Sequence, residues 1–227
     1  MSSLKTIQSE VRALRNPDIA THSQGFFKTG PGQYGEGDVF LGVRVPELRK
    51  IARRFKDIEE RITYDLLQSK YHEERLTALL IMVLKFEKGD ERQRNQIYDA
   101  YLSNTVKINN WDLVDVSADK IVGSFLENRD RTVLYKLANS RNLWEKRISI
   151  MSTFWFIRLN DFSDTLKVAD LLRHDNHDLI HKAVGWMLRE VGNRNRQVEE
   201  EFLRTSYKNM PRTMLRYSIE KFPEELR

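Results

Sequence analysis

The sequence of 227 residues contains no cysteine. This absence excludes disulfide bonds, cysteine-ligated zinc, iron–sulfur clusters and a thiol nucleophile. Glycine and proline are also scarce, with ten and five residues, which disfavours a turn-rich β-sandwich or barrel. No stretch approaches the roughly 18 consecutive apolar residues of a membrane span, and the N-terminal MSSLKTIQSEVRAL lacks the apolar segment of a signal peptide. We therefore expect a protein of the reducing cytoplasm that does not enter a membrane.

The apolar and charged fractions are those of a globular chain, 40% and 31%. Its length suits one large core, so we expect a single domain over residues 1–227. Apolar residues recur at steps of three and four in EERLTALLIMVLKFEKG, WDLVDVSADKIVGSFL, KRISIMSTFWFIRL and DLIHKAVGWMLREVG, which is helical spacing. The best strand candidate, residues 39–45, stands alone and ends at Pro46. The pattern predicts an all-α fold.

Four of the predicted helices recur at a fixed interval. Superposing them places Arg75, Trp111, Arg147 and Ala183 at successive separations of 36 residues. Shorter helical segments lie between them, and helix pairs at this period are typical of an α-solenoid, near the short end of the HEAT class. The register predicts that these four positions are equivalent on the inner helices of a concave surface.

The basic excess is moderate, with a net charge of +5 and a pI of about 9.3. The stretch VRVPELRKIARRFK concentrates it, because Glu47 is its one acid and its six cations are Arg44, Arg49, Lys50, Arg53, Arg54 and Lys56. Two interpretations stay open. The helix is either a solvated surface or a phosphate-facing element that would give salt-dependent binding of nucleic acid.

Known motifs for nucleotide binding, zinc binding and serine hydrolysis are incomplete or missing in this sequence. Gly30, Gly32 and Gly35 satisfy G-x-G-x-x-G, but Pro31 interrupts them and an extended segment follows, so we expect a surface loop and no nucleotide site. The histidines of HDNHDLIH lack the glutamate of a zincin motif, so we expect surface or capping roles for them. The G-x-S-x-G motif, which places the nucleophilic serine of α/β-hydrolases, is also missing from the sequence. We expect neither a metal nor a cofactor.

The stretch NNWDLVDVSADK raises a different question. Asp112 fits the first turn of a helix, where an acid interacts favourably with the dipole, but Asp115 lies in the second turn among apolar neighbours. Trp111 and Asp115 project from one helical face. A structural interpretation competes with a catalytic one, since Asp115 could pair with Arg147 or Arg75 of an adjacent repeat.

Aromatic residues and cations also coincide in the later repeats. Lys182 precedes Trp186 by one turn and Arg189 follows it by three residues. Rings among cations suit a polyanion with sugars and bases to contact. Lys182 and Arg189, together with Arg44, Arg49, Lys50 and Arg53, are therefore the candidate contacts to a nucleic acid.

Over nearly its whole length the chain resembles the AlkD-like DNA alkylation repair family, HEAT-like-repeat DNA glycosylases. The segments that carry the resemblance are FFKTGPGQYGEGDVFLGVRVPELRK, NNWDLVD, LWEKRISIM, AVGWMLREVG and MPRTMLRYSIEKF. The resemblance assigns the W-D-x-V-D tryptophan and aspartate to Trp111 and Asp115, the following arginine to Arg147, and the G-W-x-L-R-E tryptophan to Trp186.

The resemblance implies a base excision repair enzyme that hydrolyses the N-glycosidic bond of cationic N3- or N7-alkylated purines in duplex DNA, without extruding the base and without metal or cofactor. We expect it to act as a monomer. Some relatives with this fold are thought to bind DNA without excision. A non-catalytic module for damaged or branched DNA, or a scaffold for protein partners, is therefore the alternative.

Overall fold

The computed structural model describes residues 3–226, and helices and turns account for them. The predicted all-α fold is confirmed. Within this range the strand candidate at residues 39–45 contributes one isolated parallel bridge, from Val39 to Tyr71, and no sheet. No helix of the described chain is long and apolar enough to cross a bilayer.

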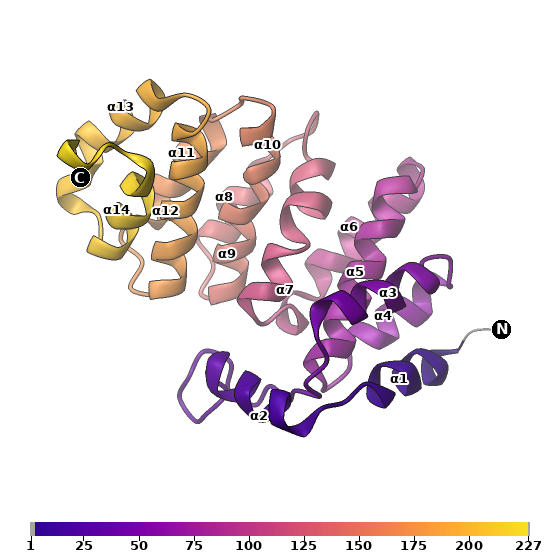
Figure 1. The fold of residues 1–227 in the computed structure, drawn as a ribbon. Helices are drawn as coiled ribbons and strands as arrows, with labels where there is room; N and C mark the ends of the chain where they lie inside the picture. Colours follow the sequence, from indigo (N-terminus) through magenta and orange to yellow (C-terminus); the bar gives the residue numbers. More distant parts are fainter. Residues whose placement is uncertain (1–2, 227) are drawn as a thin grey trace. The chain divides into compact units, whose positions relative to one another are not determined.

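The chain divides into two compact units, the first ending at Ser117 and the second beginning at Ala118. The first unit is drawn in indigo to magenta in Figure 1. Its elements are α1 (Leu4–Ala13), α2 (Pro17–Phe26), α3 (Val45–Arg54), α4 (Glu60–Leu67), α5 (His72–Lys88), α6 (Glu91–Ser103), a short 3-10 helix (Thr105–Lys107) and α7 (Trp111–Asp115).

Helix α5 is the centre of the first unit, and it packs against α1, α3, α4, α6 and α7. Its apolar side chains are buried on every side, as expected for a helix surrounded by others. It ends at Lys88, and Gly89 follows as its C-cap. Pro46 lies in the first turn of α3, where its missing N–H has no helical partner to lose.

The second unit is drawn in pink to yellow in Figure 1. Its elements are a π-helical segment (Asp119–Gly123), α8 (Thr132–Ala138), α9 (Leu143–Ser152), α10 (Phe154–Arg158), α11 (Ser163–Leu172), α12 (Asp178–Gly192), α13 (Arg196–Ser206), α14 (Arg212–Ser218) and three 3-10 helices (Tyr207–Asn209, Ile219–Lys221, Glu224–Leu226). Helix α12 is central here and packs against α9, α11, α13 and α14. Asp164 lies in the first turn of α11, and Gly192 is the last residue of α12.

The helices that carry the predicted repeat begin at residues 72, 111, 143 and 178, at intervals of 39, 32 and 35 residues. Four helices recur as expected, although their starts depart from a strict period of 36. The pattern also predicted one continuous helix over WDLVDVSADKIVGSFL, and this is wrong. Helix α7 ends at Asp115, and beyond it Ser117 donates its hydroxyl to the Leu113 carbonyl oxygen at 2.6 Å. The π-helical segment follows from Asp119.

Candidate functional site

Trp111 and Asp115 are the first and last residues of α7, and both are half-buried. Asn110 caps the helix, since it is fully buried and its Oδ1 accepts from the Trp111 backbone N–H at 2.9 Å. One turn of helix therefore places the ring and the carboxylate on the same face. Asp115 takes part in interactions of its own.

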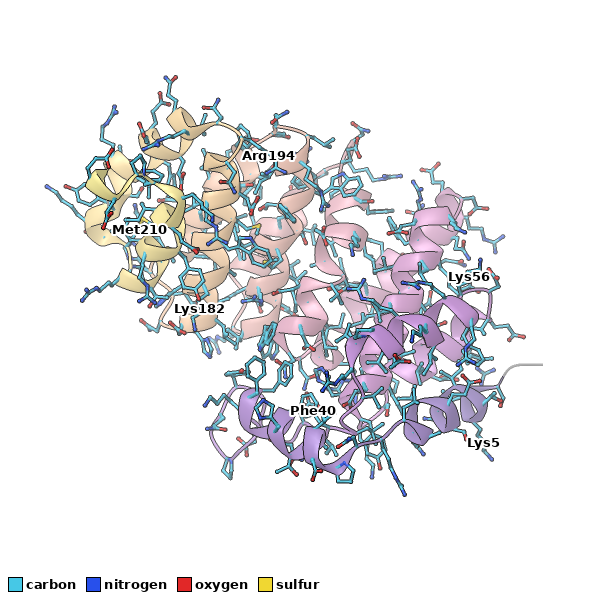
Figure 2. All side chains as sticks on the ribbon, in the orientation of Figure 1. Lys5, Phe40, Lys56, Lys182, Arg194 and Met210 are labelled. Carbon is cyan, nitrogen blue, oxygen red and sulfur yellow. The ribbon has the colours of Figure 1, made fainter. Side chains whose placement is uncertain are left out.

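The Trp111 ring is held by aromatic neighbours from the first unit. Phe27 stacks on it with centroids 5.1 Å apart, and Phe26, at the end of α2, meets it edge-on at 5.9 Å. Phe27 also stacks on Phe40 at 4.9 Å, and Phe40 stacks on His72 at 4.3 Å. Phe40 is labelled in Figure 2. Phe26 is 57% exposed, so an aromatic surface continues from Trp111 to solvent.

Asp112 does more than the helix-start role that the sequence assigned to it. It lies in the first turn of α7 as predicted. Its Oδ2, however, lies 2.8 Å from Nε2 of His72, and its Oδ1 accepts from the Leu113 backbone N–H. The prediction was incomplete because His72 is 40 residues away in the chain.

Asp112 belongs to a buried charge network that comprises Asp38, His72, Arg75 and Asp112. His72 Nδ1 lies 2.8 Å from Asp38 Oδ2, and Arg75 Nη2 donates to Asp38 Oδ1 at 2.7 Å. The side chains of His72 and Arg75 are 2% and 4% exposed, and that of Asp38 is fully buried. Buried charges of this kind are tolerated only when each is paired and hydrogen-bonded.

The network also fixes the segment that leads into α7. Arg75 donates to the backbone oxygen of Lys107 at 3.1 Å and to Oδ1 of Asn109 at 3.0 Å. Asn110 donates to Asp38 at 3.4 Å. Arg75 therefore forms an ion pair with Asp38.

Protonation of His72 follows from its two carboxylate neighbours. Burial alone would lower the pKa of His72, but Asp112 and Asp38 outweigh it and raise the pKa to about 9. Burial likewise opposes ionisation of Asp38, yet His72 and Arg75 hold the pKa of its carboxyl below the usual range. At neutral pH the network therefore contains an imidazolium.

Sequence reasoning missed His72 and Asp38. A signal was present, because His72, Glu73, Glu74 and Arg75 form a run of four ionisable residues at the start of a helix that is otherwise apolar, and all four are buried. Glu73 accepts from three successive backbone N–H groups, those of residues 41–43, at 2.7–3.2 Å. Such a run indicates that other segments of the chain supply partners.

A cavity of about 660 Å³ lies beside this network. Its walls come from α2, from residues 40–46 and from α5, and both His72 and Asp112 line it. The Asp112 side chain is 15% exposed. Solvent therefore reaches the outer end of an otherwise buried network.

Four of the predicted DNA-contacting cations lie at α3. Arg44 precedes the helix and Arg49, Lys50 and Arg53 lie on it, and all four are exposed. Lys50 pairs with Glu47 at 2.8 Å. Lys56 lies just beyond the end of α3 (Figure 2). Their clustering on one exposed helix provides positive charge that is accessible from solvent.

The remaining predicted residues belong to the second unit. Arg147, on α9, is 5% exposed and donates to the Leu179 backbone oxygen at 2.7 Å. Trp186, on α12, is half-buried, donates from Nε1 to Glu190 at 3.2 Å and lies 6.3 Å from the Phe154 ring. A side chain buried to this extent suits an orienting role better than a contact made from solvent.

Lys182 and Arg189 both engage acids. Lys182 pairs with Asp178 at 2.7 Å, and Arg189 pairs with Glu220. The Lys182 hydrogen bond holds the pKa of the Asp178 carboxyl below its usual range. Figure 2 shows Lys182 extending away from α12. Both cations would exchange or share these partners on contacting phosphate.

Trp111 and Asp115 thus lie in the first unit, and Arg147 and Trp186 in the second. The four-residue catalytic set remains a prediction. The glycine-rich segment forms turns in which Gly32 and Gly37 have positive φ. The capping role predicted in HDNHDLIH is confirmed, because His177 Nδ1 accepts from the Leu179 N–H at the start of α12. Within residues 3–226 no three histidine or acidic side chains are grouped to hold a metal.

The chain belongs to the DNA alkylation repair enzyme family, whose sequence profile matches residues 7–222. The resemblance found in the sequence is therefore confirmed. A solved structure described as a predicted DNA alkylation repair enzyme from Enterococcus faecalis is similar in fold, with a TM-score of 0.71 at 17% identity over 92% of this chain and 97% of that chain. No curated protein matches the sequence.

Proposed function

We propose that this protein is a DNA glycosylase that hydrolyses the N-glycosidic bond of cationic N3- or N7-alkylated purines in duplex DNA. Family membership supports a DNA repair reaction. The observation that carries the proposal is the pairing on α7 of a half-buried tryptophan with a half-buried carboxylate, held by a ring stack and a buried cap.

The reaction needs little machinery. An alkylated purine is already positively charged, so when the C1′–N bond breaks, the bonding electrons neutralise the departing base and no strong general acid is needed. An oxocarbenium-like sugar remains. Asp115 as a carboxylate would stabilise that cation and accept the proton of the water that attacks C1′. The products are a neutral alkylpurine and an abasic site.

The other predicted residues bind and orient the substrate in this proposal. Trp111 and Trp186 contact the sugar–phosphate backbone at the lesion, and their ring faces attract the cationic sugar. Arg147 binds phosphate and orients Asp115. The exposed cations at α3, together with Lys182 and Arg189, neutralise phosphates along the duplex.

We further propose that residues 1–227 form one α-solenoid of HEAT-like repeats with a concave basic surface, acting on duplex DNA as a monomer in the cytoplasm without metal or cofactor. The recurrence of α5, α7, α9 and α12 supports the repeat. An open surface of this kind agrees with excision that leaves the base in the duplex.

The test compares Asp115→Asn with wild type on duplex DNA that contains 7-methylguanine, scoring the free base released in single turnover. We expect a loss of roughly 10²–10³-fold with unchanged DNA affinity, because one charge-stabilising group is removed. Asp99→Asn is the matched control, since Asp99 is exposed on α6. Unchanged release by Asp115→Asn would refute the role of Asp115. Duplex binding by wild type without any release would favour the non-catalytic alternative.

A further inference from the structure

The start of α7 depends on its surroundings for its position. The helix has five residues, and a helix this short has almost no stability of its own in water. Its second residue, Asp112, lies between Trp111 and the apolar Leu113, and its carboxylate reaches back to His72 on α5. The contacts of residues 107–112 with the buried charge network therefore determine where this turn of helix lies.

His72 is the central member of that network. Both of its ring nitrogens lie 2.8 Å from a carboxylate oxygen, one of Asp38 and one of Asp112. A carboxylate can only accept, so both nitrogens must carry a proton for both hydrogen bonds to form. The other elements packed on the ring contribute Phe27 and Phe40, which carry no charge, and Arg75 pairs with Asp38.

We propose that His72 is a positioning residue for the excision reaction: as an imidazolium between Asp38 and Asp112, it holds the start of α7 and so places Trp111 and Asp115. This inference rests on the function proposed above. It gives His72 a role in the reaction through its contact with Asp112, and it makes the geometry of α7 conditional on one proton. Loss of that proton would leave one carboxylate facing a lone pair in a buried site, and Asp112 would separate from the ring.

Solvent can reach the contact between His72 and Asp112 although the His72 side chain is buried. The cavity beside the network is lined by both His72 and Asp112, and the Asp112 side chain is partly exposed. A proton can therefore leave through the outer end of the network. The pKa of about 9 places the change well above neutral pH.

Two substitutions at one position separate positioning from simple support of the fold. Asp112→Ala removes the acceptor and breaks the bridge. Asp112→Asn offers an amide N–H to a neutral His72, which still donates from Nδ1 to Asp38, so the bridge forms without the second proton. Asp99→Asn again serves as the exposed control.

The experiment measures single-turnover release of 7-methylguanine from pH 6.5 to 9.5, corrected for release without enzyme, and duplex affinity by anisotropy. We expect wild type to lose activity as pH rises through about 9. Asp112→Ala should be slower by about tenfold or more at neutral pH with similar DNA affinity. Asp112→Asn should lose less than Asp112→Ala and should lack the alkaline decline. The proposal would be overturned if Asp112→Ala released base at the wild-type rate and lost activity at alkaline pH as wild type does. It would also be overturned if Asp112→Asn lost activity over the same alkaline pH range as wild type.

Amide hydrogen exchange tests the role of His72 without depending on base release, so the two proposals can fail separately. If wild type releases no base, the glycosylase assignment fails, and the positioning role is judged from the protection of the amides of Val114 and Asp115, because the Leu113 N–H bonds to Asp112 itself. We expect these amides to be less protected in Asp112→Ala than in wild type. We also expect wild type to show less protection above pH 9 than at pH 7. Equal protection in these comparisons would overturn the role of His72.

Discussion

The stability of the first unit should depend on pH through His72. Its pKa is about 9 in the folded chain and about 6.5 in an unfolded one. A raised folded pKa contributes stability that is fully present below pH 6.5 and is lost as pH rises through 9. The difference of roughly 2.5 units corresponds to about 3 kcal/mol of the free energy of unfolding.

The perturbation is His72→Gln, which fills similar space but cannot carry the charge. Urea denaturation of both proteins at pH 6 and pH 9.5, at one ionic strength and followed by circular dichroism, gives the two free energies of unfolding. We expect the advantage of wild type over His72→Gln to shrink by about 3 kcal/mol between the two pH values. Other titrating groups cancel, because they are common to both proteins.

One result would refute this reasoning. If wild type and His72→Gln lost stability in parallel between pH 6 and 9.5, then His72 would not be held as an imidazolium between Asp38 and Asp112. The distances of 2.8 Å on both sides of the ring would then describe a neutral histidine with one unsatisfied neighbour.

Three further predictions concern other parts of the chain. Burial raises the pKa of Glu199 to about 8, so ionising it costs stability as pH rises from 4.5 through 8; the advantage of Glu199→Gln over wild type in urea unfolding should therefore grow by about 4 kcal/mol between pH 5 and pH 9. Gly42 has φ +79° and an added Cβ would lie 2.1 Å from the Asn16 backbone oxygen, so Gly42→Ala should lower the free energy of unfolding by about 2 kcal/mol or more. Replacing Arg49 and Arg53 by alanine should weaken duplex binding and reduce the slope of log Kd against log salt by about two; an unchanged slope would show that α3 does not face phosphate.

The sequence predicted the elements of this fold well where the signals are local. Helical spacing identified α5, α9 and α12, and residues of the types that begin or end helices, Asn110, Pro46 and Gly89, lie at helix ends in the structure. The family was also evident from short motifs. These features depend on residues within a few positions of each other, and local propensity and capping determine them.

The continuous helix expected after Trp111 shows the limit of that reasoning. Apolar spacing over residues 111–126 is helical, but the hydroxyl of Ser117 bonds back to Leu113 and also meets the Tyr101 hydroxyl at 2.9 Å. The second contact joins α6 to the end of α7, and nothing in the spacing indicates it. The helix therefore ends at Asp115 although the periodicity continues to residue 126.

In the candidate site, too, some features follow from local sequence and others only from packing between distant segments. The sequence by itself determined that the chain is helical, that α3 is basic, and that a tryptophan and an aspartate share one face of a short helix. Only the tertiary structure decided the role of Asp112 and brought in Asp38, His72 and Arg75, which are 34–40 residues from their partners. A buried charge is stable only beside its counter-charge. That pairing is made by packing between elements distant in the chain, and so no local pattern could show it.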